Sequence, residues 1–160
     1  MTAEQLFSLC DTLALLGWLT LAIAGRTRWV APLITGVILP LLFSVAYFAL
    51  LATHWGETKG SFATLAGLAA LFSNHWVLLA GWIHYLCFDL FIGSWQVRDA
   101  QSHAISHWLV LPCLFFTFMF GPVGLLLYFG LRAGRTRTLS IDPDRRNSAT
   151  KASSYDATLA

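Results

Sequence analysis

Residues 76–95 read WVLLAGWIHYLCFDLFIGSW, and this stretch decides the fold class. A helix of roughly 20 mainly apolar residues crosses the hydrocarbon core of a bilayer, and Trp residues commonly mark the two interfaces of such a helix. The stretch has Trp at both ends, and its strongly polar side chains are those of His84 and Asp89. It therefore predicts a transmembrane helix that carries two candidates for functional groups.

The composition of the whole chain agrees with a lipid environment. Of its 160 residues, 57% are hydrophobic and 11% are charged, and the mean hydropathy is +0.65. Soluble domains carry about a quarter charged residues, so we expect an integral membrane protein surrounded by the lipid bilayer. The length suits one compact domain. The formal net charge of +2 is too small to indicate a nucleic-acid partner.

Further apolar stretches are also long enough to cross a membrane. We predict an all-α, four-helix polytopic transmembrane bundle with spans near residues 6–24, 32–53, 76–95 and 108–131. Residues 62–73 are apolar at helical spacing but too short to cross, which indicates an interfacial or re-entrant helix between spans 2 and 3. Pro40 predicts a bend in the second span and Gly121-Pro122 a break in the fourth, because Pro lacks the N–H donor and its ring clashes with the preceding turn.

The chain divides into an integral membrane domain, residues 1–132, and a polar tail, residues 133–160. The tail is rich in Arg, Ser, Thr, Asp and Ala, and we expect it to be flexible. Four spans would place both termini of this multi-pass protein on one side of the membrane, together with Lys59 and the Arg residues that follow the last span. The positive-inside rule then favours cytoplasmic termini.

His84 and Asp89 lie five positions apart, which separates them by about 140° around a regular helix. They do not share a face, so a direct dyad is not expected and each needs a partner from another segment. We expect His84 to face an interior cavity shared with Asp99 or His103, and Asp89 to face a different neighbour. We expect His84 and Asp99 to act in acid–base catalysis and Asp89 to orient groups or stabilise charge, although a buried Asp could itself be the acid. The alternative is that these residues are structural groups that bond to neighbouring helices.

Asp99, His103 and His107 follow one another at intervals of four residues. If this segment is helical, the three side chains stack on one face, and one carboxylate with two imidazoles would suit zinc or non-haem iron. The alternative is that they are solvated groups at the entrance to the fourth span. The sequence leaves open whether any cofactor is bound.

Aromatic residues are abundant in the third and fourth spans. Trp82, Phe88, Phe115 and Phe118 are candidates for contacts with a long apolar ligand such as a polyene, whose affinity would come from dispersion and shape. Ordinary packing against lipid and neighbouring helices is the alternative for the same rings.

Two segments are distinctive as a pair. Residues 81–93 read GWIHYLCFDLFIG and are followed by Asp99-Ala100, and residues 120–128 read FGPVGLLLY. Over residues 60–132 the chain resembles the abscisic-acid-deficient-four-like family of small membrane proteins from plants and bacteria. Plant members of that family are implicated in making neoxanthin and 9-cis epoxycarotenoids.

The resemblance implies a role in carotenoid metabolism, through isomerisation of a xanthophyll or rearrangement of its epoxide. The polar positions that match are His84, Asp89 and Asp99, whereas the metal hypothesis gains nothing from the family pattern. One interpretation is a carotenoid isomerase or epoxide-rearranging enzyme, and the other is a non-catalytic pigment-binding or accessory subunit. The expected partners are a carotenoid or another long apolar ligand, and either a second copy of the chain or a membrane complex.

Overall fold

The computed structural model describes residues 1–57 and 59–139, and the regular elements of this part of the chain are all helical. In chain order they are α1 (Ala3–Ala24), the π-helical segment η1 (Val30–Ile38), α2 (Leu39–His54), the 3-10 turn η2 (Trp55–Glu57), α3 (Leu65–Phe72), α4 (His75–Ser102), α5 (His107–Phe120) and α6 (Pro122–Thr136). The all-α class predicted from the sequence is confirmed.

Local sequence signals set the starts of the main helices. Thr2 and Gln5 form a capping box at α1, in which Gln5 N donates to Thr2 Oγ1 at 3.2 Å and Thr2 N donates to Gln5 Oε1 at 2.9 Å. At the start of α4, Asn74 Oδ1 accepts a hydrogen bond from Trp76 N at 2.9 Å. These bonds satisfy backbone N–H groups that have no partner inside the helix.

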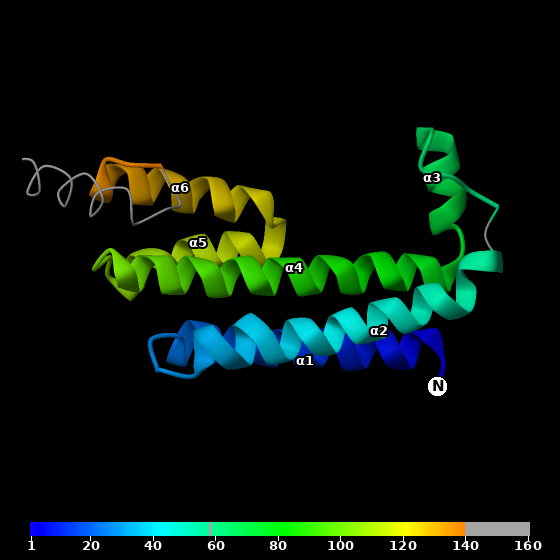
Figure 1. The fold of residues 1–160 in the computed structure, drawn as a ribbon, viewed down its shortest axis with the longest axis horizontal. Coiled ribbons are helices and arrows are strands. Elements are labelled where there is room, and N and C mark those ends of the chain that lie inside the picture. Colours follow the sequence, from blue (N-terminus) through cyan, green and yellow to red (C-terminus); the bar gives the residue numbers. More distant parts are fainter. Residues whose placement is uncertain (58, 140–160) are drawn as a thin grey trace, which may run out of the picture.

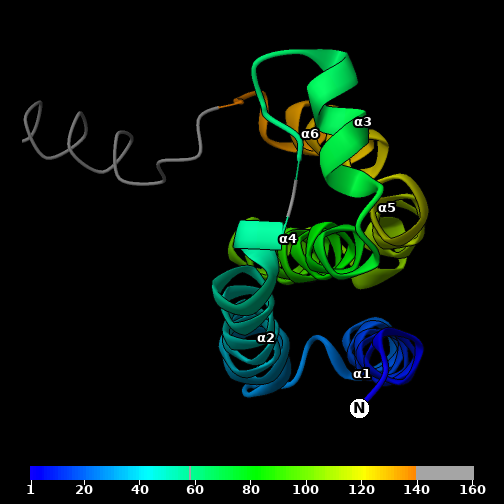
Figure 2. The same cartoon turned by 90° about the vertical axis from the view of Figure 1, so that its right-hand side faces the viewer.

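α4 is the central helix of the fold. Figure 1 shows it between the pair α1 and α2 on one side and the pair α5 and α6 on the other, and Figure 2 shows the same layers end-on. α1 and α4 run in the same direction, so their N-terminal halves lie side by side. Ile83, Leu90 and Val97 of α4 are at most 1% exposed and belong to the apolar core that joins the helices.

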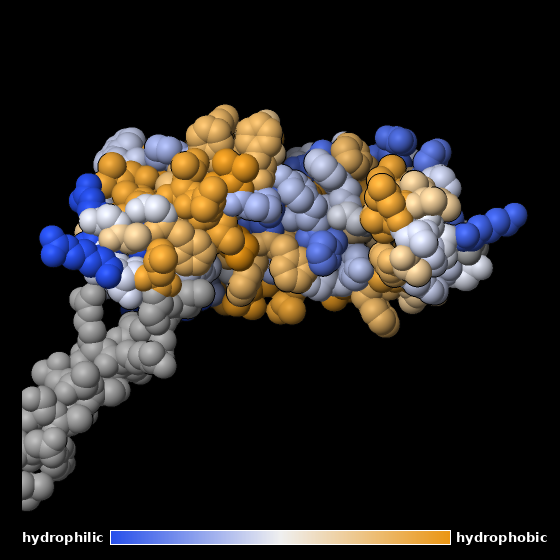
Figure 3. Space-filling model, turned by 90° about the horizontal axis from the view of Figure 1, so that it is seen from above, coloured by the Kyte–Doolittle hydropathy of each residue, from blue (hydrophilic) through white to orange (hydrophobic). Residues whose placement is uncertain are grey.

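Three helices in the described part are long and apolar enough to cross a membrane, namely α1, the continuous helix Val30–His54 and α4. They correspond to the first three predicted spans. Large apolar side chains such as Ile23, Val45 and Phe48 are exposed, and Figure 3 shows hydrophobic side chains gathered over the α5–α6 end of one face. Apolar surface of this extent suits contact with lipid rather than with water.

The second span begins with an irregular segment. Val30–Ile38 is π-helical, and regular α-helix starts at Leu39, directly before Pro40. Pro40 has no N–H to donate to the preceding turn, and the wider turns of η1 lie where that donor is missing. Thr35 Oγ1 donates to Val30 O, five residues earlier, at 3.2 Å. The structure thus shows a change of helix type directly before Pro40, and the bend expected there stays a prediction.

In place of the interrupted fourth span predicted over residues 108–131, the structure has two antiparallel helices. α5 ends at Phe120, Gly121 adopts φ +42° and ψ −91°, and α6 starts at Pro122 and runs back beside α5 (Figure 1). The break expected at Gly121-Pro122 is confirmed, but the chain reverses there, because glycine tolerates a positive φ and Pro suits the first turn of a new helix. Each arm of this hairpin is about 21–23 Å long, too short for a hydrocarbon core of roughly 30 Å.

The sequence also predicts a short helix and a polar tail. The short helix expected within residues 62–73 is present as α3, and Phe72 at its end packs against Gly81 of α4. The polar tail expected over residues 133–160 begins inside the last turn of α6. Residues 140–160 of that tail lie outside the described part of the chain.

Replacing Gly121 with Ala is expected to lower the free energy of unfolding by about 1–3 kcal/mol, the usual cost of holding a side chain in a sparsely populated backbone conformation. The added Cβ would also lie 2.9 Å from Asp89 Oδ1. The loss of helical circular dichroism on heating the detergent-solubilised protein measures the effect.

Gly130→Ala in α6 is the matched control. A Cβ at Gly130 meets no atom within 4 Å, so this change is expected to stabilise the helix by roughly 0.5–1 kcal/mol. Equal melting temperatures for the two variants would contradict the turn geometry assigned to Gly121.

Candidate functional site

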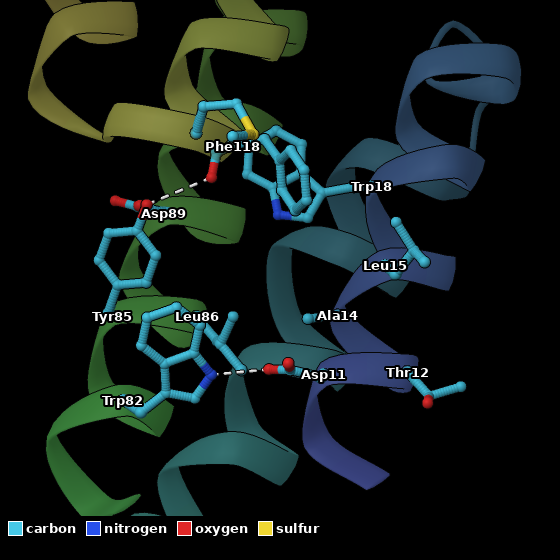
Figure 4. A pocket seen from close by; sticks show the side chains of 11 residues that line it. Asp11, Thr12, Ala14, Leu15, Trp18, Trp82, Tyr85, Leu86, Asp89 and Phe118 are labelled. Atoms are coloured by element: carbon cyan, nitrogen blue, oxygen red, sulfur yellow. Dashed lines mark hydrogen bonds between the residues drawn. The ribbon is translucent and has the colours of Figure 1, made fainter. Parts of the chain in front are cut away.

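A pocket of about 370 Å³ lies between α1, α4 and α5. Figure 4 shows side chains from these three helices arranged around it. Its walls combine two carboxylates with four aromatic rings, contributed by Asp11, Trp18, Trp82, Tyr85, Asp89 and Phe118. We call it the inner pocket. An apolar cavity with a few convergent polar groups is the usual form of a small-molecule site.

α4 supplies the polar wall of the inner pocket through regular helical spacing. Trp82, Tyr85 and Asp89 follow one another at intervals of three and four residues, which places them on one face of the helix. Asp89 lies near the middle of α4, between His75 and Ser102. In a helix that crosses a membrane, this position corresponds to the middle of the bilayer, where ionisable groups are costly and usually functional.

Asp89 has an oxygen that is free for a ligand. Its Oδ2 is buried and makes no hydrogen bond within the described residues. The neighbouring Tyr85 hydroxyl, which Figure 4 shows beside Asp89, donates to Phe118 O at 3.2 Å. A buried carboxyl oxygen without a partner is energetically unfavourable, so it marks a place where a bound molecule could supply the missing partner.

The tip of the α5–α6 hairpin lies beside Asp89. The Cβ of any larger residue at Gly121 would lie 2.9 Å from Asp89 Oδ1 and 3.0 Å from Oδ2. Gly121 is the residue that precedes α6, so the N-terminal end of that helix faces the carboxylate.

Asp11 and Trp82 form the other end of the inner pocket. Trp82 Nε1 donates to Asp11 Oδ1 at 2.6 Å (Figure 4). The Trp82 ring also stacks on Tyr85, with ring centroids 5.3 Å apart, and contacts Phe7 at 5.9 Å. These contacts hold the indole in one orientation across the groove between α1 and α4.

Asp99, a catalytic candidate predicted from the sequence, lies outside the inner pocket. Its Oδ2 accepts hydrogen bonds from Tyr128 Oη at 2.6 Å and from Arg132 Nε at 2.7 Å. Arg132 is 0% exposed, and its Nη2 lies 3.3 Å from His103 Nε2. This buried cluster ties α6 to the C-terminal end of α4 and is not part of the inner pocket.

The metal set expected at Asp99, His103 and His107 does not form. α4 ends at Ser102 and Ala104 has φ +54°, so the three side chains are not on one continuous helix. His107 Nε2 instead forms a hydrogen bond with the carbonyl oxygen of Ala22 at 2.8 Å. The Asp99 carboxylate is bound by the Arg132 guanidinium. Among the residues that the structure describes, no three His, Cys, Asp or Glu side chains are placed to hold a metal ion.

His84 lies on the side of α4 that faces away from the inner pocket. It lines a separate pocket of about 270 Å³ between α2, α3 and α4. The centroid of its ring lies 5.7 Å from that of Tyr47 and 4.5 Å from that of Phe88. The expectation that His84 shares a cavity with Asp99 or His103 is therefore wrong. The predicted separation of His84 and Asp89 onto different faces is confirmed.

The aromatic residues predicted to contact a ligand do not all lie at the inner pocket. Trp82 and Phe118 line the inner pocket, whereas Phe88 and Phe115 are 55% and 58% exposed and do not line it. Tyr85 is not among the site residues predicted from the sequence. Its spacing from Trp82 and Asp89 was the available signal, because residues three and four apart share a helix face.

Fold and site together define a class: a small protein, helical throughout its described part, with helices of membrane-spanning length and an aromatic pocket that holds two carboxylates. The chain belongs to the ABA DEFICIENT 4-like family, whose model matches residues 5–128. No curated protein and no solved structure matches the chain. Membership of the family suggests a role related to carotenoids and neoxanthin, and the match extends toward the N-terminus beyond the segments that carried the resemblance.

Proposed function

We propose that this protein binds a xanthophyll in the inner pocket and isomerises it or rearranges its epoxide. The observation that carries the proposal is the buried, unpartnered Oδ2 of Asp89 inside an aromatic pocket near the middle of α4. A polyene needs long apolar walls, and acid–base chemistry on it needs a proton-carrying group placed against those walls. The inner pocket places the carboxyl of Asp89 among aromatic walls.

Asp89 can serve as acid and base in either reaction. For an epoxide, the protonated carboxyl donates its proton to the ring oxygen as the C–O bond breaks. The other carboxyl oxygen then accepts a proton from a carbon next to the opened ring, and a new double bond forms. The product is an isomer of the substrate, Asp89 regains its proton, and no co-reactant is consumed.

For polyene isomerisation the same group acts more simply. Protonation of the chain gives a delocalised cation with a lowered barrier to rotation, and return of the proton to Asp89 restores the polyene in a new geometry. The faces of Trp18, Trp82 and Phe118 around the pocket would stabilise the cation through their ring quadrupoles. Tyr85, beside Asp89, is a positioning residue in both schemes.

Pigment analysis tests the function directly. Detergent-purified protein from carotenoid-producing cells should carry a bound carotenoid, and incubation with an epoxy-xanthophyll should yield an isomer of equal mass with a changed absorption spectrum. Chromatography with mass detection measures both. Copurified pigment that stays chemically unchanged would overturn the catalytic part and support a pigment-binding subunit. Protein that binds no carotenoid would overturn the whole proposal.

The fold also supports a specific topology. We propose three transmembrane spans, α1, Val30–His54 and α4, followed by a re-entrant hairpin of α5 and α6 whose tip reaches Asp89. Exposed arginines gather at the end of the bundle where α4 and α6 finish: Arg26, Arg28, Arg98, Arg135 and Arg137. By the positive-inside rule this end is cytoplasmic, and residue 3 lies at the opposite end.

Cysteine labelling distinguishes this topology from four spans. In intact cells, a membrane-impermeant maleimide is expected to label neither Arg28→Cys nor Arg135→Cys. Both variants should be labelled once the membrane is permeabilised. Lys59→Cys should be labelled at once. The native Cys10, Cys87 and Cys113 are buried, so they give little background. If Arg135→Cys is labelled together with Lys59→Cys, the last segment crosses the membrane and the hairpin is wrong.

A further inference from the structure

A second cavity continues the inner pocket toward the N-terminal ends of α1 and α4. This outer pocket has a volume of about 300 Å³, and its lining includes Glu4, Phe7, His75 and Leu78. Trp82 lines both the inner and the outer pocket. The two cavities are therefore parts of one groove between α1 and α4, divided by the Trp82 indole.

Because α1 and α4 run in the same direction, the residues of the two helices follow one another along this groove in the same order. Glu4 and His75 both line the outer pocket, and Trp82 Nε1 donates to Asp11 Oδ1; the members of each pair are 71 residues apart in the sequence. From the level of His75 to the level of Asp89 the groove runs along α4 for about 21 Å, at a rise of 1.5 Å per residue. It leads from the start of the helix to the middle of the span.

The polar groups of the outer pocket are free for a ligand. Glu4 and His75 are both exposed, and neither makes a side-chain hydrogen bond or ion pair within the described residues. A carboxylate accepts hydrogen bonds, and an imidazole can donate one and accept one. Together they match a hydroxyl group, which needs one acceptor and offers one of its own.

We propose that the outer pocket is a subsite for the hydroxylated end of a rod-shaped isoprenoid whose reacting end lies at Asp89. This inference rests on the proposed function and adds the orientation of the substrate. Glu4 and His75 bind the terminal hydroxyl at the membrane interface, and the unsaturated chain crosses the face of Trp82.

The subsite predicts discrimination between two otherwise identical polyenes. Protein in lipid nanodiscs is titrated with zeaxanthin, which carries terminal hydroxyls, and with β-carotene, which lacks them, and binding is followed by quenching of tryptophan fluorescence against protein-free nanodiscs. The wild-type protein should bind zeaxanthin at least tenfold more tightly, because hydrogen bonds to charged groups are among the stronger ones. Glu4→Ala and His75→Ala should each lose most of this preference while binding β-carotene as before.

Ser8→Ala, on an exposed position of α1 outside both pockets, is the control and should keep the full preference. If all three variants and the wild type bind the two polyenes equally, the subsite is wrong but the proposed function stands. If the wild type binds neither polyene, the proposed function itself fails. A melting curve for each variant separates loss of the subsite from loss of the fold.

Discussion

Asp89→Asn is expected to lower the rate of xanthophyll conversion at least 100-fold and to leave pigment binding nearly unchanged. A positioned acid–base group contributes roughly 10²–10⁴ in rate, and asparagine keeps the size of the side chain while it cannot donate and recover a carboxyl proton. The amide also leaves the packing against Gly121 intact. The measurement is the rate of product formation by chromatography in reconstituted membranes, with bound pigment quantified from its absorbance.

His84→Gln is the matched control for this experiment. It changes a polar residue at a similar depth on the same helix, but on the face that lines the pocket between α2, α3 and α4. Its conversion rate should stay within about threefold of wild type. If the His84 variant loses activity and the Asp89 variant keeps it, the pocket between α1, α4 and α5 is not the catalytic site.

Arg132→Met is expected to lower the free energy of unfolding by about 3–5 kcal/mol, the usual effect of removing one partner of a buried ion pair. Arg132 is 0% exposed and donates to Asp99 Oδ2 at 2.7 Å and to Thr138 O at 3.1 Å. Methionine fills part of the space but leaves the Asp99 charge with Tyr128 as its remaining hydrogen-bond donor. Thermal unfolding of the detergent-solubilised protein, followed by tryptophan fluorescence, measures the change.

Two further variants test whether the loss of stability comes from the buried ion pair between Asp99 and Arg132. Arg135→Met removes an exposed charge from the same helix and should change the free energy of unfolding by less than about 0.5 kcal/mol. Adding Asp99→Asn to Arg132→Met should recover part of the lost stability, because no charge is then buried without its partner. If Arg132→Met melts like Arg135→Met, the cluster does not hold the hairpin on α4.

Several features of this protein could be read from local sequence. The apolar lengths of the first three spans, the caps at Thr2 and Asn74 and the break at Gly121 depend on residues close in the chain, and the structure has each of them. The angular separation of His84 and Asp89 also follows from helix geometry alone. The resemblance to the family likewise rests on short motifs within α4 and the α5–α6 turn.

Only the tertiary structure decided which face of α4 carries the site and what residues 108–131 become. Hydropathy is the same for one long helix and for two short antiparallel ones, so the direction of the chain after Gly121 depends on long-range contacts. Gly124 packs against Thr117 across the hairpin, and Asp99 binds Arg132 from 33 residues away. Periodicity places His84 and Asp89 on different faces, but the neighbours of each face are set by how α1, α2 and α5 pack around α4, and this packing is not encoded in any single segment.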